Sequence, residues 1–173
     1  MEEKTTIGKV ALKYGLILGL LSIVYFLVLS FAGVLGKTQV WSYLGIIFTI
    51  AVIYLAHKAF KEEGDGFMSY SQGLGIGTLI CLYSSILSSI FTFVYISYVD
   101  DTMIQNIREK SIADLEARGM SPAQIDQTMG FSETFMSPGI MLIMGIVGGV
   151  LIGFIVSLIV SAITKNANPQ MSE

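Results

Sequence analysis

Hydroxyl side chains are concentrated in one apolar block of the chain, residues 73–99, where they could line a polar cavity or supply a nucleophile. The candidate polar lining consists of Ser84, Ser85, Ser88, Ser89 and Thr92. In an apolar helix, such hydroxyls commonly bond to carbonyl oxygens of their own helix and act as small packing residues. We favour packing and keep the polar lining as the alternative.

A serine nucleophile needs a base and a group that orients the base, and the sequence places no such pair near these serines. The one histidine, His57, falls at a membrane edge, and the carboxylates are confined to polar segments. Cys81 and His57 are too far apart in the sequence to begin a metal site. We therefore predict no enzymatic activity, no catalytic residue, no cofactor and no bound metal. A coupled pump is also disfavoured, because no apolar block carries the buried charge that such carriers use.

Small residues recur every four positions in two other apolar blocks, a pattern called a glycine zipper. In residues 10–35 the small residues are Ala11, Gly15 and Gly19, and in residues 139–164 they are Gly145, Gly149, Gly153, Ser157 and Ser161. Small residues at this spacing let two helix backbones approach closely, which is a main source of helix association in membranes. We favour packing of the two helices against each other within one bundle, and a homo-oligomer joined through the same seams is the alternative.

The blocks that would position these groups belong to an unusually apolar chain. Of its 173 residues, 53% are hydrophobic and only 13% are charged, and the mean hydropathy is +0.71. Four blocks, residues 10–35, 40–56, 73–99 and 139–164, could each cross a bilayer as a helix. The sequence predicts an all-α integral membrane four-helix bundle, a single domain over residues 1–173 with the lipid bilayer as its partner. A net charge of −3 with scattered basic residues excludes nucleic acid.

Residues 100–138 form the only sizeable polar segment, and their local signals predict an extramembrane helical hairpin. Good helix formers fill residues 102–118, and Gly119 is placed as a helix stop. Ser121 then precedes a proline and stands three residues before Gln124, the arrangement of a capping box at a helix start. Asp100 and Asp101 end the preceding apolar block, and we expect them to cap the hairpin's first helix, with contact to a cation as the alternative.

The distribution of basic residues predicts the orientation in the membrane. Antiparallel helices put both termini and the segment after residue 56 on one side, with six lysines: Lys4, Lys9, Lys13, Lys58, Lys61 and Lys165. The other side holds four basic residues: Lys37, Arg108, Lys110 and Arg118. Because basic residues are retained on the cytoplasmic side, we expect cytoplasmic termini and a hairpin that faces the periplasm or the exterior.

Several short motifs give the chain a resemblance to a known family. They are Lys13-Tyr14-Gly15, Phe67-Met68-Ser69-Tyr70, Tyr98-Val99-Asp100, Gly119-Met120-Ser121-Pro122 and Ser137-Pro138. Together they resemble the bacterial membrane-protein family known as domain of unknown function 4199, typical of Bacteroidota, over about residues 9–165. Asp101 stands where family members commonly have proline, so a looser turn is expected there. The resemblance implies a multi-pass protein of the cell inner membrane in a Gram-negative bacterium, and it implies no activity.

Two functions follow from these features. The first is a non-enzymatic scaffold or interaction protein whose hairpin, residues 100–138, contacts an envelope protein or a second copy of the chain, because this segment has the polar surface that recognition needs. The alternative is a small uncoupled transporter or pore, lined by the hydroxyls of residues 73–99 and assembled as an oligomer through the glycine seam of residues 139–164.

Overall fold

The computed structural model describes residues 6–35 and 40–166, which form six helices and no strand. The helices are α1 (Ile7–Phe31), α2 (Val40–Glu62), α3 (Tyr70–Tyr98), α4 (Thr102–Ala117), α5 (Pro122–Phe135) and α6 (Pro138–Thr164). Four of them are long and apolar enough to cross a membrane: α1, α2 over Tyr43–Glu62, α3 and α6. The predicted class, an all-α membrane four-helix bundle with an extramembrane helical hairpin, is confirmed.

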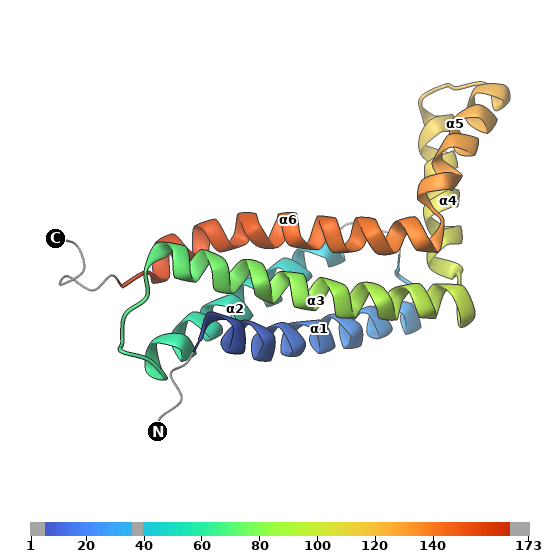
Figure 1. Cartoon of the computed structure of the whole chain (residues 1–173). Coiled ribbons are helices and arrows are strands. Elements are labelled where there is room, and N and C mark those ends of the chain that lie inside the picture. The colour runs from blue at the N-terminus through green and yellow to red at the C-terminus, as the bar shows by residue number, and fades with distance from the viewer. Residues whose placement is uncertain (1–5, 36–39, 167–173) are drawn as a thin grey trace.

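The four long helices run side by side, and the hairpin of α4 and α5 projects sideways from one end of the bundle (Figure 1). The first and last described residues both lie at the opposite end (Figure 1). Helix α3 is the central element, because it lies between α1 and α6 and packs extensively on both. Helix α2 contacts all three of these helices, each over a smaller area.

Side-chain caps explain where several helices begin. The Thr6 hydroxyl accepts from the Lys9 amide at 3.4 Å at the start of α1. Ser69 and Gln72 form a capping box at the start of α3, and the predicted box of Ser121 and Gln124 is present at the start of α5. These caps satisfy backbone N–H groups that have no partner inside the helix. The predicted stop at Gly119 is also present, with a φ of +76° that favours glycine.

Several helix ends differ from the hydropathy-based bounds. Helix α1 ends at Phe31 rather than at residue 35, before Gly33 with its φ of +66°. Helix α2 continues to Glu62, six residues beyond residue 56, so part of the expected polar loop is helical. Helix α3 begins at Tyr70, three residues before residue 73, and the glycines near its start are helical. Hydropathy marks the membrane-embedded part of a helix, whereas backbone hydrogen bonding continues into water.

The buried apolar core gathers at the end of the bundle that carries the first and last described residues. Its fully buried members include Ala11 on α1, Ile53 on α2, and Ile76 and Ile80 on α3. Toward the hairpin end, α1 and α3 meet through aromatic rings, with Phe26 and Tyr95 at a centroid distance of 5.3 Å. Aliphatic side chains therefore hold the helices together at one end of the bundle, and aromatic side chains hold α1 and α3 together at the other end.

Candidate functional site

The glycine seam of α6 lies against the hydroxyl-bearing face of α3. A Cβ atom on Gly149 would lie 2.7 Å from the Cβ of Ser85, and one on Gly145 would lie 2.6 Å from the Ser89 hydroxyl oxygen. Gly153 is in similarly close contact with Cys81. Because only glycine lacks a Cβ, each of these positions lets the two backbones approach.

Along the rest of this contact, the glycines belong to α3 and the larger residues belong to α6. Ser157 and Ser161 of α6 are fully buried, and they face glycines of α3 instead of hydroxyls. Ser157 is in close contact with Gly77, and a Cβ on Gly73 would lie 2.9 Å from the Ser161 hydroxyl oxygen. Glycine therefore stands opposite a slightly larger residue at each of five successive levels between α3 and α6.

The second seam, on α1, also packs against α3. A Cβ on Gly15 would lie 2.8 Å from the Cβ of Tyr83, and one on Gly19 would lie 2.8 Å from a methyl carbon of Leu87. Our expectation that the seams of α1 and α6 pack on each other was therefore wrong about the partner. Spacing shows that a helix face is small, but it does not show which helix covers that face.

The five candidate lining residues occupy different environments in the bundle. Ser84, Ser85 and Ser89 are buried, and Ser88 and Thr92 are half-buried. The Ser85 hydroxyl donates to the Leu82 carbonyl at 3.1 Å, and the Ser88 hydroxyl donates to the Ser85 carbonyl at 3.4 Å. Two members, Ser85 and Ser89, lie in the contact with α6. Their positions suit helix packing.

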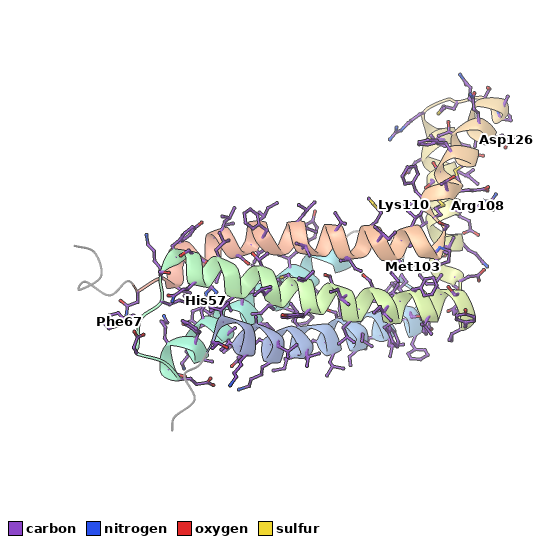
Figure 2. The ribbon with its side chains drawn as sticks, in the orientation of Figure 1. His57, Phe67, Met103, Arg108, Lys110 and Asp126 are labelled. Carbon is purple, nitrogen blue, oxygen red and sulfur yellow. The ribbon has the colours of Figure 1, made fainter. Side chains whose placement is uncertain are left out.

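A buried histidine ties three helices together at the end of the bundle opposite the hairpin. His57 of α2 is fully buried (Figure 2). Its Nε2 donates to the Gly73 carbonyl of α3 at 2.9 Å, and its Nδ1 lies 2.7 Å from the Thr164 hydroxyl oxygen of α6. Lys61, one turn later on α2, donates to the Thr164 carbonyl at 3.1 Å. These bonds satisfy polar groups that would be costly to bury alone.

Sequence reasoning missed this role of His57, because it placed the residue at a membrane edge where the second helix was expected to end. A signal was available. The apolar stripe of Val52, Ala56 and Phe60 continues at a helical spacing of four past residue 56, and His57 follows Ile53 at the same spacing. Both stripes are buried.

The hairpin has a much smaller core than the bundle. Ile125 and Met129 of α5 are its buried residues, and α4 has none. One exposed ion pair crosses between the helices, with Arg108 and Glu133 at 2.7 Å. At the root of the hairpin, the Asn106 side-chain amide donates to the Leu35 carbonyl at 2.8 Å. Few internal contacts therefore fix this hairpin, and its remaining surface is available for contacts with other molecules.

The two acidic residues before α4 divide the capping role in an unexpected way. Asp101 occupies the N-cap position but makes no cap hydrogen bond, and its carboxylate accepts from the Gln105 side chain at 2.8 Å. Asp100 instead accepts from the Thr102 amide at 2.9 Å and from the Thr102 hydroxyl. These hydrogen bonds favour the ionised form and so lower the pKa of the Asp100 carboxyl.

Helical geometry sorts the hairpin side chains onto two opposite flanks, since residues two positions apart lie on nearly opposite sides of a helix. Asn106 faces the end of the bundle, so Arg108 faces away from it. Glu133 pairs with Arg108 and therefore shares this outer flank, as does Asp126, two turns earlier on α5. Lys110 is one turn after Asn106 and lies on the inner flank. Figure 2 labels Lys110 on the side toward α6 and the other two labelled hairpin charges, Arg108 and Asp126, on the opposite side.

The outer flank of the hairpin is the surface that carries Arg108, Asp126 and Glu133. It offers charged and hydrogen-bonding groups for recognition. Among residues 6–35 and 40–166, no three His, Cys, Asp or Glu residues are grouped so that they could hold a metal ion.

The four spans and the projecting hairpin define the class of this protein, a polytopic helical membrane protein. The chain belongs to the family described as protein of unknown function (DUF4199), whose family model matches residues 13–166. This match confirms the family resemblance of the motifs. Searches of curated proteins and of solved structures found no match.

Proposed function

We propose that this protein is a non-enzymatic scaffold of the membrane surface and that the outer flank of its hairpin binds a protein partner. The observation that carries the proposal is the separation of charges on α5, where Asp126 and Glu133 share the flank that faces away from the bundle. A bundle held together by buried packing supplies a rigid base for this surface, and the hairpin supplies groups that can recognise a partner outside lipid.

The charge of the hairpin indicates the kind of partner. Residues 100–138 carry seven acidic and three basic side chains. A basic surface on the partner would be attracted to this excess of acid, which raises association rates and excludes acidic competitors. The partner we propose is therefore a protein with a basic patch, which includes an envelope protein but excludes nucleic acid.

The orientation that we propose places the termini in the cytoplasm of a bacterial inner membrane and the hairpin on the other side. Lys9, Lys13, Lys58, Lys61 and Lys165 belong to the terminal end of the bundle. This excess of lysine supports the orientation by the positive-inside rule. The recognition surface would then face the periplasm.

The alternative, an oligomeric pore, needs the α6 glycine seam at a contact between copies. In this structure Gly145, Gly149 and Gly153 face α3 of the same chain. Two of the proposed lining serines, Ser85 and Ser89, lie in the same contact. The positions of these residues support our preference for a scaffold.

The proposal can be tested with a photo-activated crosslinking residue at Gly130, which lies near the outer flank and has open space around it. The matched control carries the crosslinker at Gln124, which is exposed on the inner flank of the same helix. In cells that naturally make the protein, Gly130 should give a discrete protein adduct, and Asp126→Lys should abolish it. Adducts of equal yield from both positions, or adducts unaffected by Asp126→Lys, would rule the outer flank out as the binding surface.

A further inference from the structure

Two aromatic side chains on the inner flank of the hairpin are exposed outside the spanning helices. Phe131 is 72% exposed and Phe135 is 50% exposed, and their rings lie 5.2 Å apart. Residues 100–137 contain no other exposed large apolar side chain. Every other large apolar residue of this segment, among them Ile112 and Leu115, is at least half-buried. This aromatic pair is therefore an exception that needs an explanation outside the hairpin core.

The orientation of the pair follows from the ion pair on the same helix. Phe131 precedes Glu133 by two residues, and Phe135 follows it by two, so both rings lie on the side of α5 opposite Glu133. Glu133 contacts Arg108 on the outer flank. The two phenylalanines are therefore on the inner flank, the side of α5 opposite Glu133.

The connection to α6 fixes the level of this flank relative to the membrane. Helix α5 ends at Phe135, and the spanning helix α6 begins at Pro138, only three positions later. The hairpin projects sideways from this end of α6, away from the other long helices (Figure 1). The lipid-facing side of α6 below it exposes Ile143, Met144 and Val147. Phe135 is therefore within three positions of the residue at which the candidate spanning helix α6 begins.

The composition of the two flanks of α5 differs as an interfacial helix requires. Its inner flank consists of Gln124, Thr128, Phe131 and Phe135, without a charge, whereas both of its carboxylates are on the outer flank. On α4, the side of Asn106 carries Lys110, whose flexible stem can reach a phosphate, together with Glu109 and Asp114. Phenylalanine is among the residues that interfacial helices bury at the boundary between headgroups and acyl chains.

We propose that the hairpin lies on the membrane surface, with Phe131 and Phe135 inserted into the interface between the headgroups and acyl chains of the surrounding phospholipids. The lipid contact supplies the apolar burial that the small core of Ile125 and Met129 does not. It also holds the outer flank toward water. The inference concerns the inner flank and does not depend on the function proposed for the outer flank.

Tryptophan fluorescence in phosphatidylcholine vesicles tests this contact on the full chain. Trp41 is the single tryptophan, so a Trp41→Phe background allows one reporter at a time, at Phe131→Trp or at Phe135→Trp. The matched control, Asp126→Trp, is on the outer flank of the same helix. Vesicles made with lipids brominated at shallow acyl positions quench tryptophan only by direct contact with lipid. Because these lipids occupy both leaflets, the orientation of the reconstituted chain does not affect the result.

We expect blue-shifted emission and several-fold stronger quenching at positions 131 and 135 than at position 126. Water-like emission with equal quenching at all three positions would overturn the proposal. Blue-shifted emission without quenching by brominated lipid would also overturn it, because a second copy or another protein would then cover the rings. Circular dichroism identifies a variant that fails to fold, and the second phenylalanine position then gives the decision.

Discussion

The Nδ1 atom of His57 lies 2.7 Å from the hydroxyl oxygen of Thr164, which joins α2 to the last turn of α6. Because Nε2 of the same ring donates to the Gly73 carbonyl, one imidazole links all three helices. The Thr164 hydroxyl also lies 2.8 Å from the Val160 carbonyl oxygen, so its single proton is shared between that carbonyl and Nδ1 of the ring. Helix α2 has the least extensive packing of the four spans, so this ring is an important tie for it.

Replacement of His57 by leucine should destabilise the bundle. The change removes the side-chain bond to the Gly73 carbonyl and one of the two partners of the Thr164 hydroxyl in a buried site, and such a loss costs roughly 1–3 kcal/mol. Thermal unfolding in a mild detergent should show a lower midpoint for His57→Leu. Thr78→Val is the matched control, since the Thr78 hydroxyl bonds only to Leu74 within its own helix.

A double-mutant cycle separates the hydrogen bond from general packing effects. Thr164→Val removes the same bond from the other side, so the double variant with His57→Leu should lose less stability than the two single variants together. If the losses simply add, the two side chains do not interact in the folded protein.

The contact between α3 and α6 gives a second prediction, which compares two adjacent glycines. Gly149 faces Ser85, whereas a Cβ on Gly148 would meet nothing within 4 Å. Gly149→Ala should therefore destabilise the protein by about 1–3 kcal/mol, the usual cost of overpacking. Gly148→Ala should be neutral or stabilise by up to about 1 kcal/mol, because alanine is the better helix former.

Chemical denaturation in mixed micelles would measure both variants, and Ser85→Gly should restore part of the stability lost in Gly149→Ala. Cross-linking of the same samples reports the oligomeric state. Loss of an oligomer in Gly149→Ala while the single chain keeps its stability would contradict the packing of this seam on α3 and favour the pore.

The sequence was sufficient for the spans and the hairpin because these depend on local properties. Long apolar blocks identify helices that can span a bilayer. The capping box of Ser121 and Gln124 marks the start of α5 and depends only on residues close in the sequence. Helix pairing depends on the three-dimensional arrangement. The glycines of α1 and α6 were recognised as packing surfaces, but their common partner α3 could be found only when the helices were placed in space.

The hidden role of His57 has a similar cause. Its neighbours Lys58 and Lys61 are polar, and hydropathy therefore ends the membrane block at Ala56. In the folded chain, His57 points into the bundle and Lys61 reaches the end of α6. Helical periodicity carries information here that average hydropathy discards. The two flanks of the hairpin could not be predicted from the sequence either. The contact between Arg108 and Glu133 is needed to show which face of α5 lies on the same side as which face of α4.

The ion pair between Arg108 and Glu133 should contribute little to the stability of the hairpin. Both side chains are about half exposed, at 55% and 51%, and exposed pairs are worth at most about 1 kcal/mol. Arg108→Glu should nevertheless loosen the hairpin by placing two like charges together. Hydrogen exchange of the α5 amides would show this as faster exchange, and the swapped pair Arg108→Glu with Glu133→Arg should reverse most of it. Unchanged exchange in Arg108→Glu would mean that the two helices are held in place by other contacts.

Asp100 gives the start of α4 a dependence on pH. Its hydrogen bonds with Thr102 lower the pKa of the folded carboxyl below the unfolded value of about 4. The ionised carboxylate therefore stabilises the folded turn above the unfolded pKa, and this contribution is lost as the pH falls through the folded pKa. Because both hydrogen bonds join Asp100 to the adjacent Thr102, the effect should be local. Exchange protection of the Thr102 amide, corrected for its intrinsic pH dependence, should fall at acidic pH in the natural chain.

In Asp100→Asn, the side-chain oxygen can still accept a hydrogen bond but does not titrate in this range, so protection should be weaker and independent of pH. The control variant Asp101→Asn should retain the natural pH dependence. An acid-dependent loss of protection that survives in Asp100→Asn would assign the titration to another group.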